Sequence, residues 1–220
     1  RTIWYNDGIG SASRLVDSLV ILHLFTIEVY AEYSLGNIEV PVNLLLAATV
    51  TVLVPEISRL YQNGDLSGIA TLWRESVARL SLVIWPLFFF LFTHADSIMA
   101  MYPDNYGRTA WVFRVFLLAL PLRIAVYNPL LVGIGKAKWA LWGSVGDLLL
   151  NIGLSLTAYY ILIRIWPEWA FLGPAGATVF ATYIQVFFLV AAIAVHLRWQ
   201  VGQLLPWASL GRGLGLGLLA

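Results

Sequence analysis

The 220-residue chain contains no cysteine and few charged residues. The lack of cysteine excludes disulfides and thiolate metal sites, but it fixes no cellular compartment. Charged residues make up 11% of the chain and apolar residues 60%, against about 25% and 45–50% in soluble domains. The mean hydropathy is +0.80. No basic run resembles a nucleic-acid patch, so nucleic acid is not expected as a partner. This composition predicts a polytopic membrane protein.

Groups of residues that are typical of catalysis are also missing. The histidines His23, His94 and His196 lie on different segments and lack the spacing of metal ligands. No Ser–His–Asp group, carboxylate pair at a cleft or metal cluster is discernible in the sequence. We therefore predict no metal, no cofactor and no catalytic residue, and we expect a protein that is not an enzyme.

What the sequence does contain is a series of apolar stretches long enough to cross a bilayer, which takes about 20 residues. The expected spans are 9–29, 36–57, 76–100, 110–134, 139–163 and 173–197, and a further span starts near Leu204. Short polar connections separate them and leave no room for a soluble domain. The predicted fold is an all-α, polytopic transmembrane helical bundle, in which residues 1–200 form one lobe and residues 201–220 begin another helix.

Both ends of the sequence look cut. The chain starts at Arg1, without an initiator Met or a signal peptide, and it stops at Ala220 within a new apolar stretch. We expect a fragment of a longer polytopic protein.

Lysine and arginine predict the orientation, because cytoplasmic loops carry the excess of these residues. One side of the predicted bundle collects Arg59, Arg74, Arg79, Lys136, Lys138, Arg198 and Arg212. The other side holds Arg108, Arg114 and Arg164 beside Glu32, Asp96, Asp104 and Glu168. The loops YQNGDLSG and GKAK are therefore expected in the cytoplasm, and YPDNYGR and RIWPEW outside.

Ionisable side chains near the middle of these spans are the most informative feature. They are Arg14, Asp17, Arg123 and Asp147. On insertion scales such a residue costs about 2.5–3.5 kcal/mol at the centre of a membrane helix, so it normally faces a polar interior. Arg14 and Asp17 share a helix face, and they form either a structural ion pair or part of a ligand site. Arg123 has no acidic residue within a turn or two of its own helix, so it needs either Asp17 or Asp147 from another helix or an anionic ligand, and we favour the ligand.

Uncharged polar residues accompany these charges. Asp147 and Asn151 share a face of the fifth span, and Gln185, Asn128 and Asn43 lie at membrane depth in other spans. A single polar group of this kind typically hydrogen-bonds to a neighbouring helix. Several such groups on different helices suggest a water-filled interior that can hydrogen-bond a sugar. The predicted substrate-binding residues are Arg14, Asp17, Arg123, Asp147, Asn151 and Gln185.

Two further patterns bear on helix geometry. Pro121 and Pro129 flank Arg123, so that a predicted kink coincides with a charge. Near the end of the chain, Gly211 and Gly215, or Gly213 and Gly217, fit a close helix–helix contact between small residues.

Several motifs in order carry a resemblance to a known family. They are LVDSLVI, the stretch 33–65 with its SRLYQNGD ending, the turn LVGIGKAK and the segment GPAGATVFAT. Over residues 11–198, the chain resembles the polysaccharide (oligosaccharide) flippases of the multidrug/oligosaccharidyl-lipid/polysaccharide exporter superfamily. Such proteins have two six-helix lobes around a central cavity, and this chain is similar to the second lobe plus the start of a thirteenth helix.

The resemblance implies a function and its partners. It implies translocation of an undecaprenyl-diphosphate-type lipid-linked oligosaccharide across the cytoplasmic (inner) membrane of a prokaryote, for surface polysaccharide biosynthesis. The implied partners are this lipid, membrane lipid, the N-terminal lobe of the same protein and a coupling proton or sodium ion. The alternative is a cation-coupled multidrug exporter, which would need more acidic residues than arginines in its cavity. A membrane-embedded glycosyltransferase or ligase is less favoured, because the loops are too short to carry catalytic carboxylates.

Overall fold

The computed structural model describes residues 21–38, 40, 42–102, 107–199 and 207–218. Within them every regular element is a helix, which confirms the all-α prediction. The elements are α2 (Ile27–Gly36), α3 (Val42–Gln62), α4 (Leu66–Thr93), α5 (Ala95–Met99), α6 (Thr109–Leu117), the 3₁₀ helix η1 (Leu120–Ile124), α7 (Tyr127–Gly133), α8 (Ala137–Ile165), the 3₁₀ helix η2 (Pro167–Trp169), α9 (Leu172–Leu197) and α11 (Trp207–Leu218).

Five segments of the described chain are long and apolar enough to cross a membrane. They are Val42–Gln62, Leu66–Thr93, Thr109–Gly133, Ala137–Ile165 and Leu172–Leu197. The chain is therefore a multi-span helical membrane protein. The expected span 9–29 lies largely outside the described residues, and α11 occupies the place expected for the helix that begins near Leu204.

Two expected spans have wrong boundaries. The span expected at 36–57 begins later, because α2 ends at Gly36 with Asn37 as its C-cap and α3 starts at Val42. The span expected at 76–100 is the helix Leu66–Thr93, which starts at the Asp65 N-cap, where the Asp65 carboxylate accepts a bond from the Gly68 N–H at 2.8 Å. The polar beginning of α4 hid this start from the hydropathy pattern.

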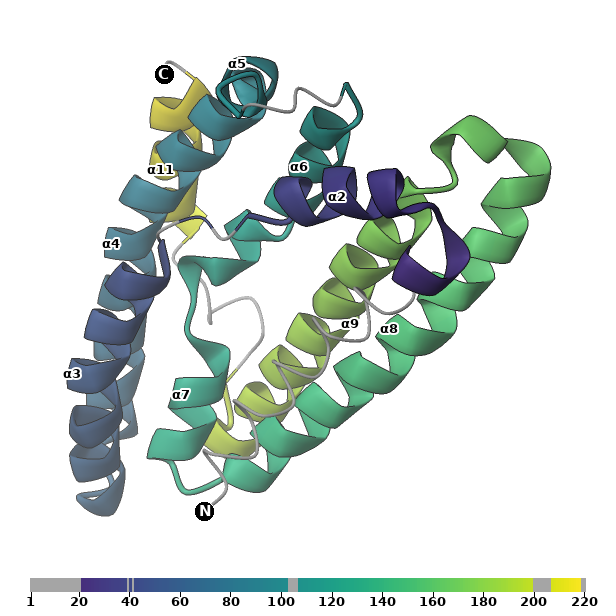
Figure 1. The fold of residues 1–220 in the computed structure, drawn as a ribbon. Coiled ribbons are helices and arrows are strands. Elements are labelled where there is room, and N and C mark those ends of the chain that lie inside the picture. The colour runs from purple at the N-terminus through teal and green to yellow at the C-terminus, as the bar shows by residue number, and fades with distance from the viewer. Residues whose placement is uncertain (1–20, 39, 41, 103–106, 200–206, 219–220) are drawn as a thin grey trace.

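The predicted YQNGDLSG and GKAK loops are tight turns built in the same way. Gly64 and Gly135 each have φ of +73°, a backbone conformation that glycine adopts readily. After Gly64 the Asp65 N–H bonds back to Leu60 O at 3.0 Å, and after Gly135 the Lys136 N–H bonds to Leu131 O at 2.8 Å. Both patterns are helix C-caps of the Schellman type. Figure 1 shows both turns at the lower end of the molecule.

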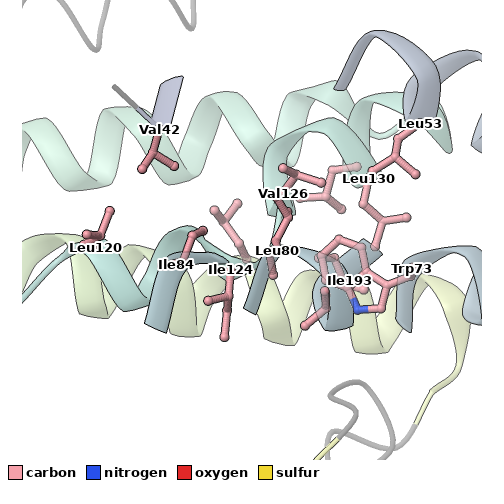
Figure 2. Packing of buried hydrophobic residues seen from close by; sticks show 14 of the residues in the cluster. Val42, Leu53, Trp73, Leu80, Ile84, Leu120, Ile124, Val126, Leu130 and Ile193 are labelled. Atoms are coloured by element: carbon pink, nitrogen blue, oxygen red, sulfur yellow. The ribbon is translucent and has the colours of Figure 1, made fainter. Parts of the chain in front are cut away.

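The helices form two arms that spread from a shared lower end (Figure 1). Helices α3, α4 and α11 make one arm, and α8 and α9 pack side by side in the other. The segment α6–η1–α7 runs between them. A large apolar cluster ties this segment to α3, α4 and α9, and Figure 2 shows Leu120, Ile124 and Leu130 among the buried side chains of this cluster.

The close contact predicted near the end of the chain is made by one of the two glycine pairs. A Cβ on Gly213 would lie 3.0 Å from Ser81 O, and one on Gly217 would lie 3.0 Å from Trp85 O. A Cβ on Gly211 or Gly215 would meet nothing within 4 Å. Gly213 and Gly217 therefore let α11 approach α4, as small residues do between membrane helices.

Candidate substrate cavity

The span expected as a continuous helix over 110–134 is broken. α6 ends at Leu117, η1 covers Leu120–Ile124, and α7 starts at Tyr127. Between η1 and α7, Ala125 is fully extended with φ −131° and ψ 140°. The prediction of one kinked helix over 110–134 was therefore wrong. Arg123 lies at the end of η1, beside the break. Non-helical backbone at membrane depth is tolerated where protein buries it or where it lines a cavity.

Proline and a cross-helix hydrogen bond explain where the span breaks. In a continuous helix the Pro129 ring would collide with the carbonyl of Ala125, and the Pro121 ring with that of Leu117. The Leu122 N–H bonds to Ala119 O at 3.2 Å, one residue short of the α-helical acceptor Leu118. The Leu118 carbonyl instead accepts the hydroxyl of Tyr183 on α9, at 3.0 Å. The break is thus stabilised by a neighbouring helix.

A cavity of about 540 Å³ lies beside this break. Its walls come from the segment between α2 and α3, from α3, from α6–η1–α7 and from α9. Most lining side chains are apolar, and the polar or charged ones are Asn37, Arg123, Tyr127, Asn128, Thr178, Thr182 and Gln185. Of the described residues that line the cavity, Arg123 alone is charged. The volume falls within the roughly 300–1,000 Å³ of typical small-ligand sites.

Arg123 is exposed at the cavity and bonded across the fold. Its Nη1 donates to Oδ1 of Asn43, in the first turn of α3, at 2.5 Å. The Asn43 amide carries no charge. The guanidinium has five N–H donors in a planar fork, so it can hold the amide and an anion together.

The α9 wall presents a polar stripe to the cavity. Thr178, Thr182 and Gln185 follow one another at helical spacing and line the same space. The structure thus brings Gln185 and Arg123, both predicted from the sequence, to one cavity.

The other predicted residues lie elsewhere. Asn151 is 1% exposed in the contact between α8 and α9, where its Oδ1 accepts the hydroxyls of Ser155 at 2.9 Å and Thr178 at 3.1 Å. Asp147 is one turn earlier on α8, with one carboxylate oxygen buried, and it does not line the cavity. Asn151 thus contacts a cavity-lining residue from behind. Arg14 and Asp17 lie outside the described residues.

Sequence reasoning did not assign Thr178 and Thr182 to the site. Threonine is common in membrane helices, so neither residue stands out alone. The available signal was their register with Gln185, which places all three on one helix face. Within the described residues no group of histidine, aspartate and glutamate could hold a metal ion.

Comparison with known proteins assigns no family to this chain. No protein-family model matches it, and neither a curated protein nor a solved structure does. Its established class is therefore the one that the fold defines, a multi-pass helical membrane protein.

Proposed function

We propose that this chain forms the cavity wall of a flippase, which moves an isoprenoid-diphosphate-linked oligosaccharide across a cytoplasmic membrane by alternating access. The carrying observation is the charge of the cavity. Arg123 is the one charged side chain among the described residues that line it. A planar guanidinium binds phosphate oxygens through paired hydrogen bonds.

The broken span supports a transport role. Discontinuous membrane helices recur at the binding sites of transporters, where unwound backbone lines the cavity. Here the extended Ala125 lies next to Arg123, and both line the cavity. Loosened helix segments also give the bundle a place to bend as the cavity switches sides. Pro121 and Pro129 thus place the flexible part of the span beside Arg123, the proposed binding residue.

The two alternatives fit the cavity less well. A multidrug exporter for cations needs a carboxylate near its ligand, yet Asp147 lies outside the described lining. A glycosyltransferase or ligase needs catalytic carboxylates, and the described lining contains none. An anionic headgroup matches this lining best.

In the proposed mechanism, the diphosphate and the sugar of the substrate are bound by different residues. The diphosphate keeps a counter-charge while it crosses, supplied by Arg123 and by Arg14 if that side chain faces the same cavity. The sugar loses water and regains hydrogen bonds from the polar wall, because unpaired polar groups are costly in an apolar medium. Asp17 and Asp147 are assigned to balancing the arginines or to the coupling ion. A second lobe encloses the substrate.

Replacement of Arg123 tests the proposal. Arg123→Ala should abolish export of the lipid-linked sugar, while the amount of protein in the membrane is unchanged. Arg123→Lys should keep part of the activity, because it retains the charge and loses the two-pronged geometry. Both are measured by surface polysaccharide at native expression levels and by translocation in proteoliposomes.

Arg164→Ala is the matched control, since Arg164 is exposed at the end of α8 and does not line the cavity. It should export normally. Normal export by Arg123→Ala would refute the assignment of the diphosphate to Arg123.

A further inference from the structure

A second cavity, the α8–α9 groove, opens between helices α8 and α9 and has a volume of about 570 Å³. Its lining includes Ala158 and Leu162 of α8, Trp169 of η2, and Gly176 and Phe180 of α9. Of the described lining residues, only Thr157 and Trp169 carry a polar side-chain atom, and the Thr157 hydroxyl already donates to Gly153 O at 2.7 Å. The groove therefore suits an apolar ligand.

Gly176 hollows the floor of this groove. A Cβ on Gly176 would meet nothing within 4 Å, whereas one on Gly173 would lie 3.2 Å from Cδ1 of Leu162. The two helices thus touch at Gly173 and leave space at Gly176. Ile161 and Phe180, on the two sides of the groove, are 50% and 58% exposed. The groove is therefore open to its surroundings from the side.

The α8–α9 groove and the substrate cavity lie on opposite faces of α9. Gly176 and Phe180 line the groove, whereas Thr178 and Thr182 line the substrate cavity. Each threonine follows its counterpart in the groove by two residues, which is about 200° around an α-helix. A lipid whose diphosphate lies at Arg123 is therefore separated from this groove by α9.

An arginine and three aromatic rings gather at the Trp169 end of the groove. The Cζ atom of Arg108, the N-cap residue of α6, lies 5.5 Å from the ring centre of Phe171. The Phe171 ring stacks on Trp169 with the ring centres 6.3 Å apart, and Trp111 meets Trp169 edge-on at 5.6 Å. Tryptophan is enriched at the headgroup level of a bilayer. We expect this end of the groove at that level, and the rest of the groove among the lipid chains.

The charges at this end favour an anion. Arg108 is exposed, and its charge acts on the Glu32 carboxyl of α2, but within the described residues the two groups form no ion pair. Arg164 and Glu168, which lie between Leu162 and Trp169 in the sequence, carry opposite charges and offset each other. The guanidinium of Arg108 can therefore bind a phosphate through paired hydrogen bonds.

An anionic phospholipid joins these two chemistries, an apolar chain and a phosphate, in one molecule. We infer that the α8–α9 groove binds one acyl chain of such a lipid, with the lipid phosphate at Arg108. The length of the groove fits this ligand. From Leu162 to Leu154 the α8 wall extends about 12 Å, which is close to half of the roughly 30 Å hydrocarbon core, the depth of one leaflet. The inference goes beyond the proposed function, because this lipid is not the one transported.

Lipid binding to the complete purified protein tests the inference. Phosphatidylglycerol and phosphatidylcholine with identical acyl chains are titrated separately, and the bound lipid is counted by native mass spectrometry. The wild type should prefer phosphatidylglycerol by about 5-fold, the effect of one basic residue near an anionic headgroup. Arg108→Ala should lose this preference. Lys138→Ala is the matched control, because Lys138 is exposed at the other end of α8, and it should keep the preference.

Gly176→Leu tests the groove itself. The added side chain occupies the open floor, so binding of both phospholipids at this site should be lost. Gly146→Leu is the control, because a Cβ on Gly146 also meets nothing within 4 Å but Gly146 does not line the groove. It should bind both phospholipids as the wild type does. Without added lipid, both variants should melt at or above the wild-type temperature, because leucine is a better helix former than glycine.

Several results would overturn the inference. Equal affinity of the wild type for the two phospholipids, or an unchanged preference in Arg108→Ala, would exclude Arg108 as the phosphate site. Unchanged binding by Gly176→Leu would exclude the groove as the acyl-chain site. Displacement of the bound phospholipid by undecaprenyl diphosphate would assign the groove to the transported lipid. A wild-type dimer that Gly176→Leu converts to a monomer would show that a second copy of the chain fills the groove.

Discussion

The span Thr109–Gly133 and helix α8 are similarly apolar, yet they fold differently. Their mean hydropathies are 1.9 and 1.7, but α8 runs unbroken over Ala137–Ile165 while the other span is divided into three pieces. The broken span contains Pro121 and Pro129, and α8 contains no proline. Proline alone does not cause such a break, because α3 and α4 contain Pro55 and Pro86 and are continuous helices. The broken span differs from them in carrying two prolines and a carbonyl, that of Leu118, which accepts a bond from Tyr183 of a neighbouring helix.

The polar groups of α8 and of the broken span also differ in their hydrogen-bond partners. In α8, the hydroxyls of Ser144 and Thr157 donate to carbonyls of their own helix, and Asn151 bonds within the α8–α9 contact. In the broken span, Arg123 reaches across to α3 and faces a cavity. The polar groups of α8 thus bond within the helix or to α9, and the broken span presents its charge to the cavity.

The largest expected effect on stability concerns packing behind the break. Gly133, at the end of α7, is so close to α3 that an added Cβ would lie 2.7 Å from Cγ2 of the buried Ile57. Gly133→Ala should destabilise the protein by about 1–3 kcal/mol through overpacking, offset in part by the roughly 1 kcal/mol helix advantage of alanine. Thermal unfolding in detergent measures the change.

Gly176 in the continuous α9 provides the matched control. A Cβ there would meet nothing within 4 Å. Gly176→Ala should leave the melting temperature equal or higher. Equal melting of the Gly133→Ala protein and the wild type would show that α7 is not clamped against α3, and the contrast between the two regions would lose its packing basis.

The next prediction tests whether Asn151 only holds α8 against α9 or also contacts the substrate. Asn151→Ala removes the acceptor shared by Ser155 and Thr178. We expect a loss between about 0.6 kcal/mol, the average for a hydrogen bond between membrane helices, and about 1.7 kcal/mol, the largest value found in such double-mutant cycles. Binding of undecaprenyl diphosphate should be unchanged, because Asn151 does not line the cavity. Weaker binding of glycosylated lipid by a variant of unchanged stability would instead support a direct sugar contact, as the sequence predicted.

The sequence predicted those parts of the fold that depend on local composition. The five described spans and the short polar connections between them follow from apolar length, and Arg123 was singled out because of the cost of a charge in lipid. The break was missed because prolines within membrane helices more often only bend them. The interior position of Asn151 and the Arg123–Asn43 bond depend on which helices become neighbours, and a single sequence does not contain that information.

The smallest expected effect concerns the N-terminal end of the broken span. Arg114 of α6 bonds to Asp96 of α5, with Nη2 to Oδ2 at 2.5 Å, and its guanidinium lies 5.2 Å from the ring centre of Trp111. The hydrogen bond from Arg114 lowers the pKa of Asp96 below its ordinary 3.8. Because the Asp96 carboxylate is 72% exposed, Asp96→Asn should cost only about 0.2–1 kcal/mol at neutral pH.

The pH dependence of that difference identifies its cause. A carboxyl whose pKa is lowered by folding stabilises the protein above the ordinary Asp value, and this contribution disappears as the pH falls through the lowered pKa. The wild type and Asp96→Asn should therefore differ at neutral pH and converge in acid. Glu75→Gln is the control, because its pair with Arg79 is long, at 3.6 Å, and exposed on both sides, and it should change little at any pH. A difference between wild type and Asp96→Asn that persists in acid would mean that Asp96 acts through packing and not through its charge.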